Sequence, residues 1–154
     1  MRINEMKTVM DKETRLAYLV KEGFNYAGDL KLCSPQSIYD FMEERYQLSY
    51  QTEEHVYAIC MEANMRLIGI FHISSGSVNA SIVDIRGLMI KTLLANATNF
   101  ILIHNHPSGS TNPSSEDIRV SKRLKEAGNL LNIQMVDSLI IGDTYYSLKE
   151  NGLL

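Results

Sequence analysis

The chain has 154 residues, of which 45% are hydrophobic and 21% charged, and these values are those of one ordinary globular domain rather than a disordered or fibrous chain. Its formal net charge of −3 gives no overall attraction to the phosphates of a nucleic acid, so such binding is possible only as a local contact and is not supported by charge. No apolar run approaches the roughly 20 residues that span a bilayer, and the N-terminus lacks the apolar core of a secretory signal, so we expect a cytoplasmic protein that does not bind a membrane.

The first 30 residues are predicted to form a separate N-terminal arm or helix. A mixed helical pattern runs around Lys12 to Glu22, and a polar connector that contains glycine extends from Gly23 to Asp29. The rest of the chain, residues 31–154, is expected to form one domain.

A helix is predicted to begin at Ser34-Pro35, because a serine hydroxyl can cap free amides and proline suits the first helical turn. Apolar residues at helical spacing follow as far as Tyr46. β-forming residues then extend from His55 to Glu62 and from Arg66 to Ile73, on either side of a short polar break. This pattern predicts a β-hairpin.

A loop rich in serine, glycine and asparagine, Ser74 to Ala80, leads toward a second predicted helix from Leu88 to Asn96. The strand predicted after it, Asn99 to His104, is a short β-rich apolar run of the kind found in central strands covered on both faces. The apolar side of the second helix is expected to consist of Leu88, Ile90, Leu93 and Leu94.

The prolines and the glycine between Pro107 and Pro113 predict a loop. An amphipathic helix is expected to open at Ser114 and to run to about Ala127, with Gly128 as its stop signal. Two closing strands, residues 133–141 and 145–148, are joined by Gly-Asp-Thr. The resulting order of elements predicts an α/β (α+β) fold in which helices pack on a mixed sheet.

Two histidines at the end of the central strand are the first candidate site residues. Residues i and i+2 of an extended chain project to the same side, so His104 and His106 can direct both imidazoles at one point. The loop can return so that Asp117, in the first turn of the next helix, adds a carboxylate oxygen. Two imidazoles and a carboxylate leave one position of a zinc ion open for water, which is typical of catalytic zinc sites. The alternative is a pair of loop histidines that binds nothing, beside an aspartate that suits only the helix dipole.

The full string resembles a known motif. His104-x-His106, seven intervening residues and Ser114-x-x-Asp117 are similar to the JAMM motif of the JAB/MPN metalloproteases. The longer string His-Asn-His-Pro-Ser-Gly followed by Pro-Ser-x-x-Asp resembles the RadC branch of that superfamily, and the match covers the chain from about Ser34 to the C-terminus. The resemblance implies a cytidine-deaminase-like JAB/MPN architecture for residues 31–154, with Zn²⁺ held by His104, His106 and Asp117.

The resemblance also implies two residues that act on the substrate. Ser114 would polarise the substrate carbonyl or stabilise its oxyanion, although a serine in this position is equally typical of a helix N-cap. Glu54 matches the glutamate that the family uses as general base. Glu53 would point to the opposite side of the same strand, so only one of the two can face the metal. Asp84 is a rival carboxylate that can instead cap a helix.

The chain departs from the family at two places. RadC-like proteins usually have an Asp-His pair before an Ile-Ile-Gly run, whereas this chain has Asp137-Ser138. The 30 N-terminal residues lack the glycine hairpins of a helix-hairpin-helix DNA-binding region, so a role in DNA repair transfers poorly. Arg119, Lys122 and Arg123 share a helix face that could touch phosphate, but a solvated surface is the simpler interpretation.

Two functions from different classes follow. The first is a zinc-dependent hydrolase of a peptide or protein substrate, cleaving peptide or isopeptide bonds, in which Glu54 activates the metal-bound water and Ser114 helps to stabilise the oxyanion. The alternative is a RadC-like, DNA-repair-associated binding module without turnover, which predicts salt-dependent binding to nucleic acid. His55 and His72 lack ligand spacing and are expected to be partly exposed strand residues outside the site.

Overall fold

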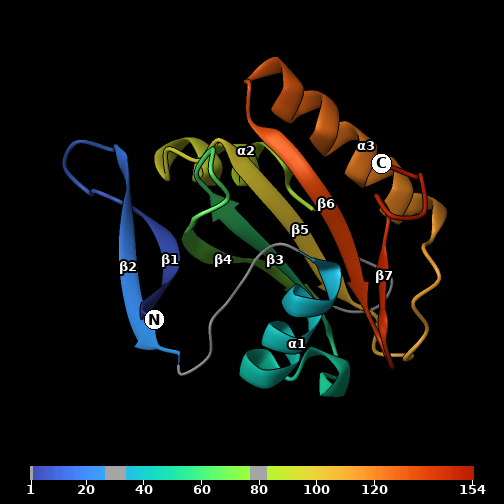
Figure 1. Ribbon diagram of the computed structural model, residues 1–154. Coiled ribbons are helices and arrows are strands. Elements are labelled where there is room, and N and C mark those ends of the chain that lie inside the picture. The colour runs from blue at the N-terminus through green and yellow to red at the C-terminus, as the bar shows by residue number, and fades with distance from the viewer. Residues whose placement is uncertain (1, 27–33, 77–82) are drawn as a thin grey trace.

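The computed structural model describes residues 2–26, 34–76 and 83–154 (Figure 1). The elements are, in chain order, β1 (Arg2–Met10), β2 (Ala17–Asn25), α1 (Pro35–Tyr46), a 3-10 turn (Leu48–Tyr50), β3 (Glu54–Met61), β4 (Leu67–Gly76), α2 (Ile85–Leu94), β5 (Asn99–Asn105), α3 (Ser115–Leu130), β6 (Gln134–Ile141) and β7 (Tyr145–Ser147). From α1 onward, helices and strands follow the order that the sequence predicts. Within these ranges, no helix combines the length and the apolar character that crossing a membrane requires.

Seven strands form one mixed sheet with the spatial order β2-β1-β4-β3-β5-β6-β7. β1 pairs in parallel with β4, and β5 pairs in parallel with β6, while the other neighbours are antiparallel. The predicted hairpin is β3–β4, in which β4 extends to Gly76 and so into the predicted loop; residues 77–80 of that loop lie outside the described residues. The fold is α+β with a mixed sheet, which confirms the predicted fold class and is consistent with a JAB/MPN domain.

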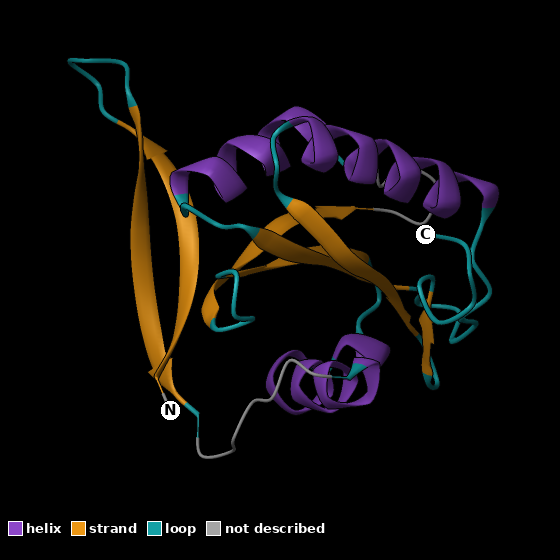
Figure 2. Ribbon diagram, turned by 45° about the horizontal axis from the view of Figure 1, so that its top comes forward, coloured by secondary structure: helices purple, strands orange, loops and turns teal. Residues whose placement is uncertain are grey.

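Helices cover both faces of the sheet: α2 and α3 pack on one face and α1 on the other (Figure 2). The alternation of side chains along each strand divides the core in the same way. On β5, Ile101 and Ile103 join the cluster with α1, while Phe100 and Leu102 join the cluster with α2 and α3. Every residue of β5 is buried, so the prediction of a central strand covered on both faces is confirmed.

The N-terminal segment differs from the prediction. β1 and β2 form an antiparallel hairpin, and the helix expected around Lys12 to Glu22 is wrong. An ion pair of 2.8 Å between Lys7 Nζ and Glu22 Oε1 joins the two strands. Strands with many exposed polar residues give a weak periodic pattern, so a short window of sequence does not separate them from an amphipathic helix. Gly23 belongs to β2, and residues 27–29 of the predicted connector lie outside the described residues.

The hairpin is joined to the rest of the molecule through β1. Besides the pairing of β1 with β4, the carboxylate of Glu5 accepts hydrogen bonds from Arg45 (3.1 Å) and from the hydroxyl of Tyr46 (2.9 Å), both in α1. The hairpin therefore extends the sheet of the main domain. The division into an arm of residues 1–30 and a domain of residues 31–154 stays a prediction.

Two details of the helices need correction. α2 buries Leu88 and Met89, but Leu93 and Leu94, which the sequence places on its apolar side, are 52% and 39% exposed because they lie in the last turn of this short helix. α3 continues through Gly128 to Leu130, so this glycine is not a stop signal. It lies inside the helix where the backbone carbonyl of Ile133, the residue before β6, approaches closely.

Candidate metal centre

The candidate site lies where β5 ends and α3 begins. His104 is the penultimate residue of β5, and its partner on β3 is Val56. Beyond the strand, the backbone N–H of His106 donates to the carbonyl of Ile141 (2.8 Å), which holds this residue beside the end of β6. Asp117 is the third residue of α3. A strand end and a helix start therefore meet at one end of the sheet.

A tight turn returns the chain from the histidines toward α3. Gly109 has a φ of +80°, which side chains rarely allow, and a Cβ at this position would collide with the carboxylate of Asp143. The N–H of Gly109 donates to the carbonyl of His106 (3.0 Å), and the N–H of Asp143 donates to the carbonyl of Gly109 (2.8 Å). The conformation of this loop therefore requires the glycine of the His-Asn-His-Pro-Ser-Gly string.

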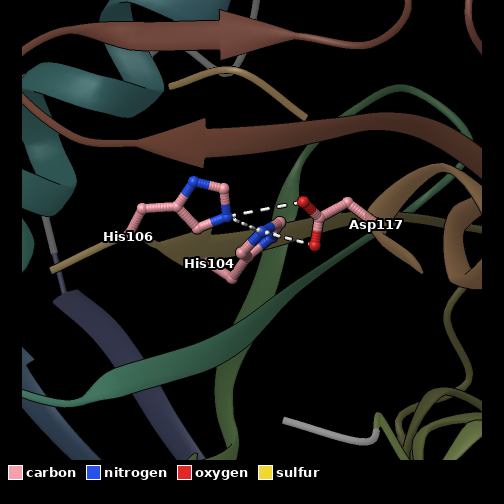
Figure 3. A group of neighbouring side chains, drawn as sticks. All are labelled: His104, His106 and Asp117. Atoms are coloured by element: carbon pink, nitrogen blue, oxygen red, sulfur yellow. Dashed lines mark hydrogen bonds and ion pairs between the residues drawn. The ribbon is translucent and has the colours of Figure 1, made fainter. Parts of the chain in front are cut away.

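The three predicted ligand side chains point toward one another (Figure 3). Nε2 of His104 and Nε2 of His106 are 3.2 Å apart. Asp117 places Oδ1 3.2 Å from Nε2 of His104 and Oδ2 3.4 Å from Nε2 of His106. His104 is buried, and the other two side chains are half-buried. The structure thus brings together all three residues that the sequence predicts as ligands.

A hydrogen bond to Nδ1 of His106 determines which ring nitrogen is protonated, and so which one offers a lone pair to the cluster. Nδ1 of His106 lies 2.9 Å from the carbonyl oxygen of Ser110. A carbonyl oxygen only accepts, so Nδ1 carries the hydrogen and Nε2 of the neutral ring is the acceptor. Metal-bound histidines are commonly held by a hydrogen bond of this kind from the nitrogen that does not bind the metal.

The electrostatics of the cluster favour a positive charge within it. Burial alone would raise the pKa of the Asp117 carboxyl, but hydrogen bonds from His104 and His106 outweigh burial and hold the pKa well below its usual range. The hydrogen bond with Asp117 raises the pKa of His106 against the opposing effect of burial, and the charge of Glu54 adds to this rise. Either a proton or a metal cation supplies the charge that this arrangement stabilises.

The distances fit zinc. Tetrahedral ligands at about 2.0–2.1 Å from Zn²⁺ lie about 3.3 Å from one another. The two Nε2 atoms are 3.2 Å apart, and each lies 3.2 or 3.4 Å from the nearer of the two oxygens of Asp117. Two imidazole nitrogens and one carboxylate oxygen are also a ligand set of catalytic zinc sites, in which the fourth position is kept for water or substrate. These residues could therefore hold a metal ion with little movement.

Ser114 is the N-cap of α3, as the sequence predicts. Its Oγ accepts a hydrogen bond from the N–H of Asp117 (3.1 Å), and Oδ2 of Asp117 accepts one from the N–H of Ser114 (2.7 Å). This capping box satisfies two amides of the helix start and also fixes the orientation of the Asp117 carboxylate. A hydroxyl that accepts a hydrogen bond keeps its own proton for donation, so capping does not compete with a contact to a substrate oxygen.

Glu54 opens β3 and is buried, whereas Glu53 is exposed. Alternation along the strand gives Glu54 the same face as Val56, which is the face of His104 and of the cluster with α2 and α3. Asp84 occupies the N-cap position of α2, is exposed and makes no side-chain cap hydrogen bond. Among these three carboxylates, Glu54 is the buried one and the one whose charge acts on His106.

A second pair of histidines lies on the other face of the sheet. Nδ1 of His55 is 3.3 Å from Nε2 of His72, and the ring of His72 packs on that of Tyr57, which contacts the cluster with α1. His55 is half-buried and His72 is exposed, so the prediction of partly exposed strand histidines is confirmed. The pair is separate from the candidate site.

The other residues that the sequence singles out, the basic residues of α3 and Ser138, make contacts within the protein or lie exposed on its surface. Arg119 forms an ion pair of 2.6 Å with Glu116, and its basic neighbours on α3 are exposed. Ser138, which stands at the position of the missing family histidine, is fully buried, and its hydroxyl accepts a hydrogen bond from that of Ser121 (3.0 Å). Its N–H donates to the buried carboxylate of Asp137 (2.7 Å).

Asn105 is the residue of the site that sequence reasoning missed. It is fully buried and bonds to the backbone of residues 53 and 55. Only its position between two candidate ligands could have drawn attention to it.

Comparison with known proteins gives consistent matches. A family model described as the RadC-like JAB domain matches residues 32–153. A UPF0758 protein of Clostridium kluyveri is 41% identical over 134 residues, which are 86% of this chain and 58% of the relative. A UPF0758 protein of Caldanaerobacter subterraneus subsp. tengcongensis is 38% identical over 149 residues, 96% of this chain and 61% of the relative. A UPF0758 protein of Methanosarcina barkeri is 38% identical over 125 residues, 80% of this chain and 54% of the relative. The chain therefore spans 54 to 61% of the length of these relatives.

Proposed function

Because the chain belongs to the RadC-like JAB domain family, we propose that it is a zinc-dependent hydrolase of peptide or isopeptide bonds. The observation that carries the proposal is the convergence of the His104 and His106 Nε2 atoms and the Asp117 carboxylate at 3.2 to 3.4 Å from one another. Three electron-pair donors directed at one point are the arrangement expected of a cation site. The relatives are longer than this chain, so the activity and its substrate are both part of the proposal.

Each residue has its own role in this reaction. A zinc ion held by His104, His106 and Asp117 would supply Lewis acidity and lower the pKa of a water molecule toward neutrality. Glu54 accepts a proton from the attacking water and returns it to the leaving nitrogen. The hydroxyl of Ser114 donates to the developing oxyanion, while its oxygen keeps the hydrogen bond from the N–H of Asp117.

The first test is the metal content of the chain after zinc-replete expression without a histidine tag. We expect about one zinc per chain, and we expect His106→Ala to lose it because a catalytic zinc site needs three protein ligands. His72→Ala is the matched control, since it also removes one histidine of a close pair, 3.3 Å from His55, but on the other face of the sheet. The control should keep its zinc.

Zinc-free wild-type protein would contradict the proposal, and so would zinc that survives His106→Ala and disappears in His72→Ala. A measurement of turnover distinguishes the hydrolase from the alternative function, a binding module associated with DNA repair. That module would bind nucleic acid with a steep dependence on salt and would cleave nothing in a screen of peptides and isopeptide-linked small proteins.

A further inference from the structure

Asn105 lies between the two candidate histidine ligands in the sequence, but its side chain bonds to a different strand. It is fully buried. Its Oδ1 accepts a hydrogen bond from the N–H of His55 (2.6 Å), and its Nδ2 donates to the carbonyl of Glu53 (3.0 Å). Because a backbone N–H only donates and a carbonyl only accepts, these partners also determine the orientation of the side-chain amide. The two bonds use the peptide groups on either side of Glu54.

These bonds take the place of strand pairing. The antiparallel pairing of β3 with β5 ends at Val56 and His104, and the N–H of His106, just beyond β5, donates to the carbonyl of Ile141 in β6. The carbonyl of Glu53 and the N–H of His55 lie beyond this pairing, and the amide of Asn105 supplies a donor and an acceptor for them, like those of a further peptide group. With both flanking peptide groups held, the Cα–Cβ direction of Glu54 is fixed and only its side-chain torsions remain variable.

We infer that Asn105 is a positioning residue that holds Glu54, through the backbone, in register with the metal ligands. The inference rests on the proposed function and deepens it. Asn105 is joined by one peptide bond to His104 and by another to His106. The segment from His104 to His106 therefore positions both the two histidine ligands and Glu54. This matters because a general base must lie within hydrogen-bond distance of the proton that it accepts, directly or through one water.

A purely structural role for Asn105 is the competing explanation, and the chain contains a matched control for it. Asn99, at the other end of β5, is also buried, and its Nδ2 donates to the backbone carbonyl of Glu62 (2.8 Å), just beyond the other end of β3. Both asparagines thus connect β5 to the backbone at one end of β3, Asn99 by one side-chain hydrogen bond and Asn105 by two. If the hydrogen bonds of Asn105 only stabilise the fold, removing either asparagine side chain should lower the melting temperature and leave the properties of the metal site unchanged.

The experiment uses the cobalt-loaded full chain, because the visible absorption of Co²⁺ responds to pH when a group beside the metal ionises. We expect Glu54→Gln to move the midpoint of this transition by roughly one unit or more, the scale on which a nearby charge acts. Asn105→Ala should move the midpoint in the same direction. The double variant should move it no further than Glu54→Gln alone, because the effect of Asn105 passes through Glu54. Asn99→Ala should keep the wild-type midpoint while its melting temperature falls.

The outcomes separate the two proposals. An unchanged midpoint in Asn105→Ala, beside a shifted one in Glu54→Gln, overturns the positioning role and leaves the proposed function intact. Additive shifts in the double variant also overturn it. Wild-type protein that binds no cobalt, or a midpoint that Glu54→Gln leaves in place, overturns the proposed function and the inference with it. If Asn105→Ala does not fold, Asn105→Ser replaces it, since a serine hydroxyl is too short to bond both peptide groups.

Discussion

The proposed function assigns two tasks to individual residues of the site, holding a cation and moving a proton. His104, His106 and Asp117 provide the converging ligand atoms, whereas Glu54 is buried at the start of β3 and acts on His106 through its charge. Replacing the carboxylate of Glu54 by an amide keeps its shape and removes its basicity. We therefore expect Glu54→Gln to retain the zinc and to lower kcat by roughly 10²- to 10⁴-fold, the usual contribution of a general base.

The measurement is steady-state kinetics on a substrate found in the peptide and isopeptide screen, together with metal analysis of the same sample. Glu53→Gln is the matched control, because its carboxylate is the exposed neighbour on the same chain segment. It should leave kcat within a factor of about two, as expected for a surface change. Loss of turnover in Glu53→Gln instead would show that the base has been wrongly assigned.

At the scale of elements, the packing of α3 depends on a glycine. Gly128 is buried inside the helix, where a Cβ would collide with the carbonyl of Ile133 and would lie 3.3 Å from the ring of Phe100. Alanine would gain about 1 kcal/mol of helix propensity, but forcing a group into a packed interior costs about 1–3 kcal/mol. We expect Gly128→Ala to lower the free energy of unfolding, measured by urea denaturation. Gly76→Ala, whose new methyl group meets open space, should change it little, and a more stable Gly128→Ala would contradict this account.

Elements with a strong local signal were predictable from the sequence. The serine-proline helix start of α1, the apolar run within the fully buried β5 and the capping box of α3 each depend on neighbours a few residues away. The ligand cluster was predictable for the same reason, because strand alternation aligns His104 with His106 and the cap sets the position of Asp117. The roles of Glu54 and Ser114 in the reaction stay predictions.

Features that depend on distant partners were not predictable. β2 is a strand that β1 pairs with along its whole length, a partner that lies outside the window in which the helical pattern was read. The role of Asn105 depends on bonds to residues 50 and 52 positions earlier in the chain.

For the molecule as a whole, metal binding and folding should be separable. The core consists of apolar clusters on both faces of the sheet, while the candidate metal site lies at one end of β5. Zinc at 100 times its Kd would stabilise the folded chain by about 2.7 kcal/mol, which is roughly 5–10 °C in Tm for a domain of this size. We expect a chelator to lower Tm by about this amount while the far-ultraviolet circular dichroism stays unchanged. In His106→Ala the chelator should have no effect, and a chelator that unfolds the wild type outright would contradict the separation.

β2 is an edge strand of the sheet, and its middle residue, Lys21, is exposed. Two molecules that joined these edges around a two-fold axis would align β2 antiparallel to its own copy. The register that overlaps all of Ala17–Asn25 would then place each Lys21 opposite the other, and like charges in directly opposed positions destabilise such a pair. Among the described residues, β2 ends the sheet on this side, and a lysine at its centre thus disfavours the growth of the sheet from one molecule into the next.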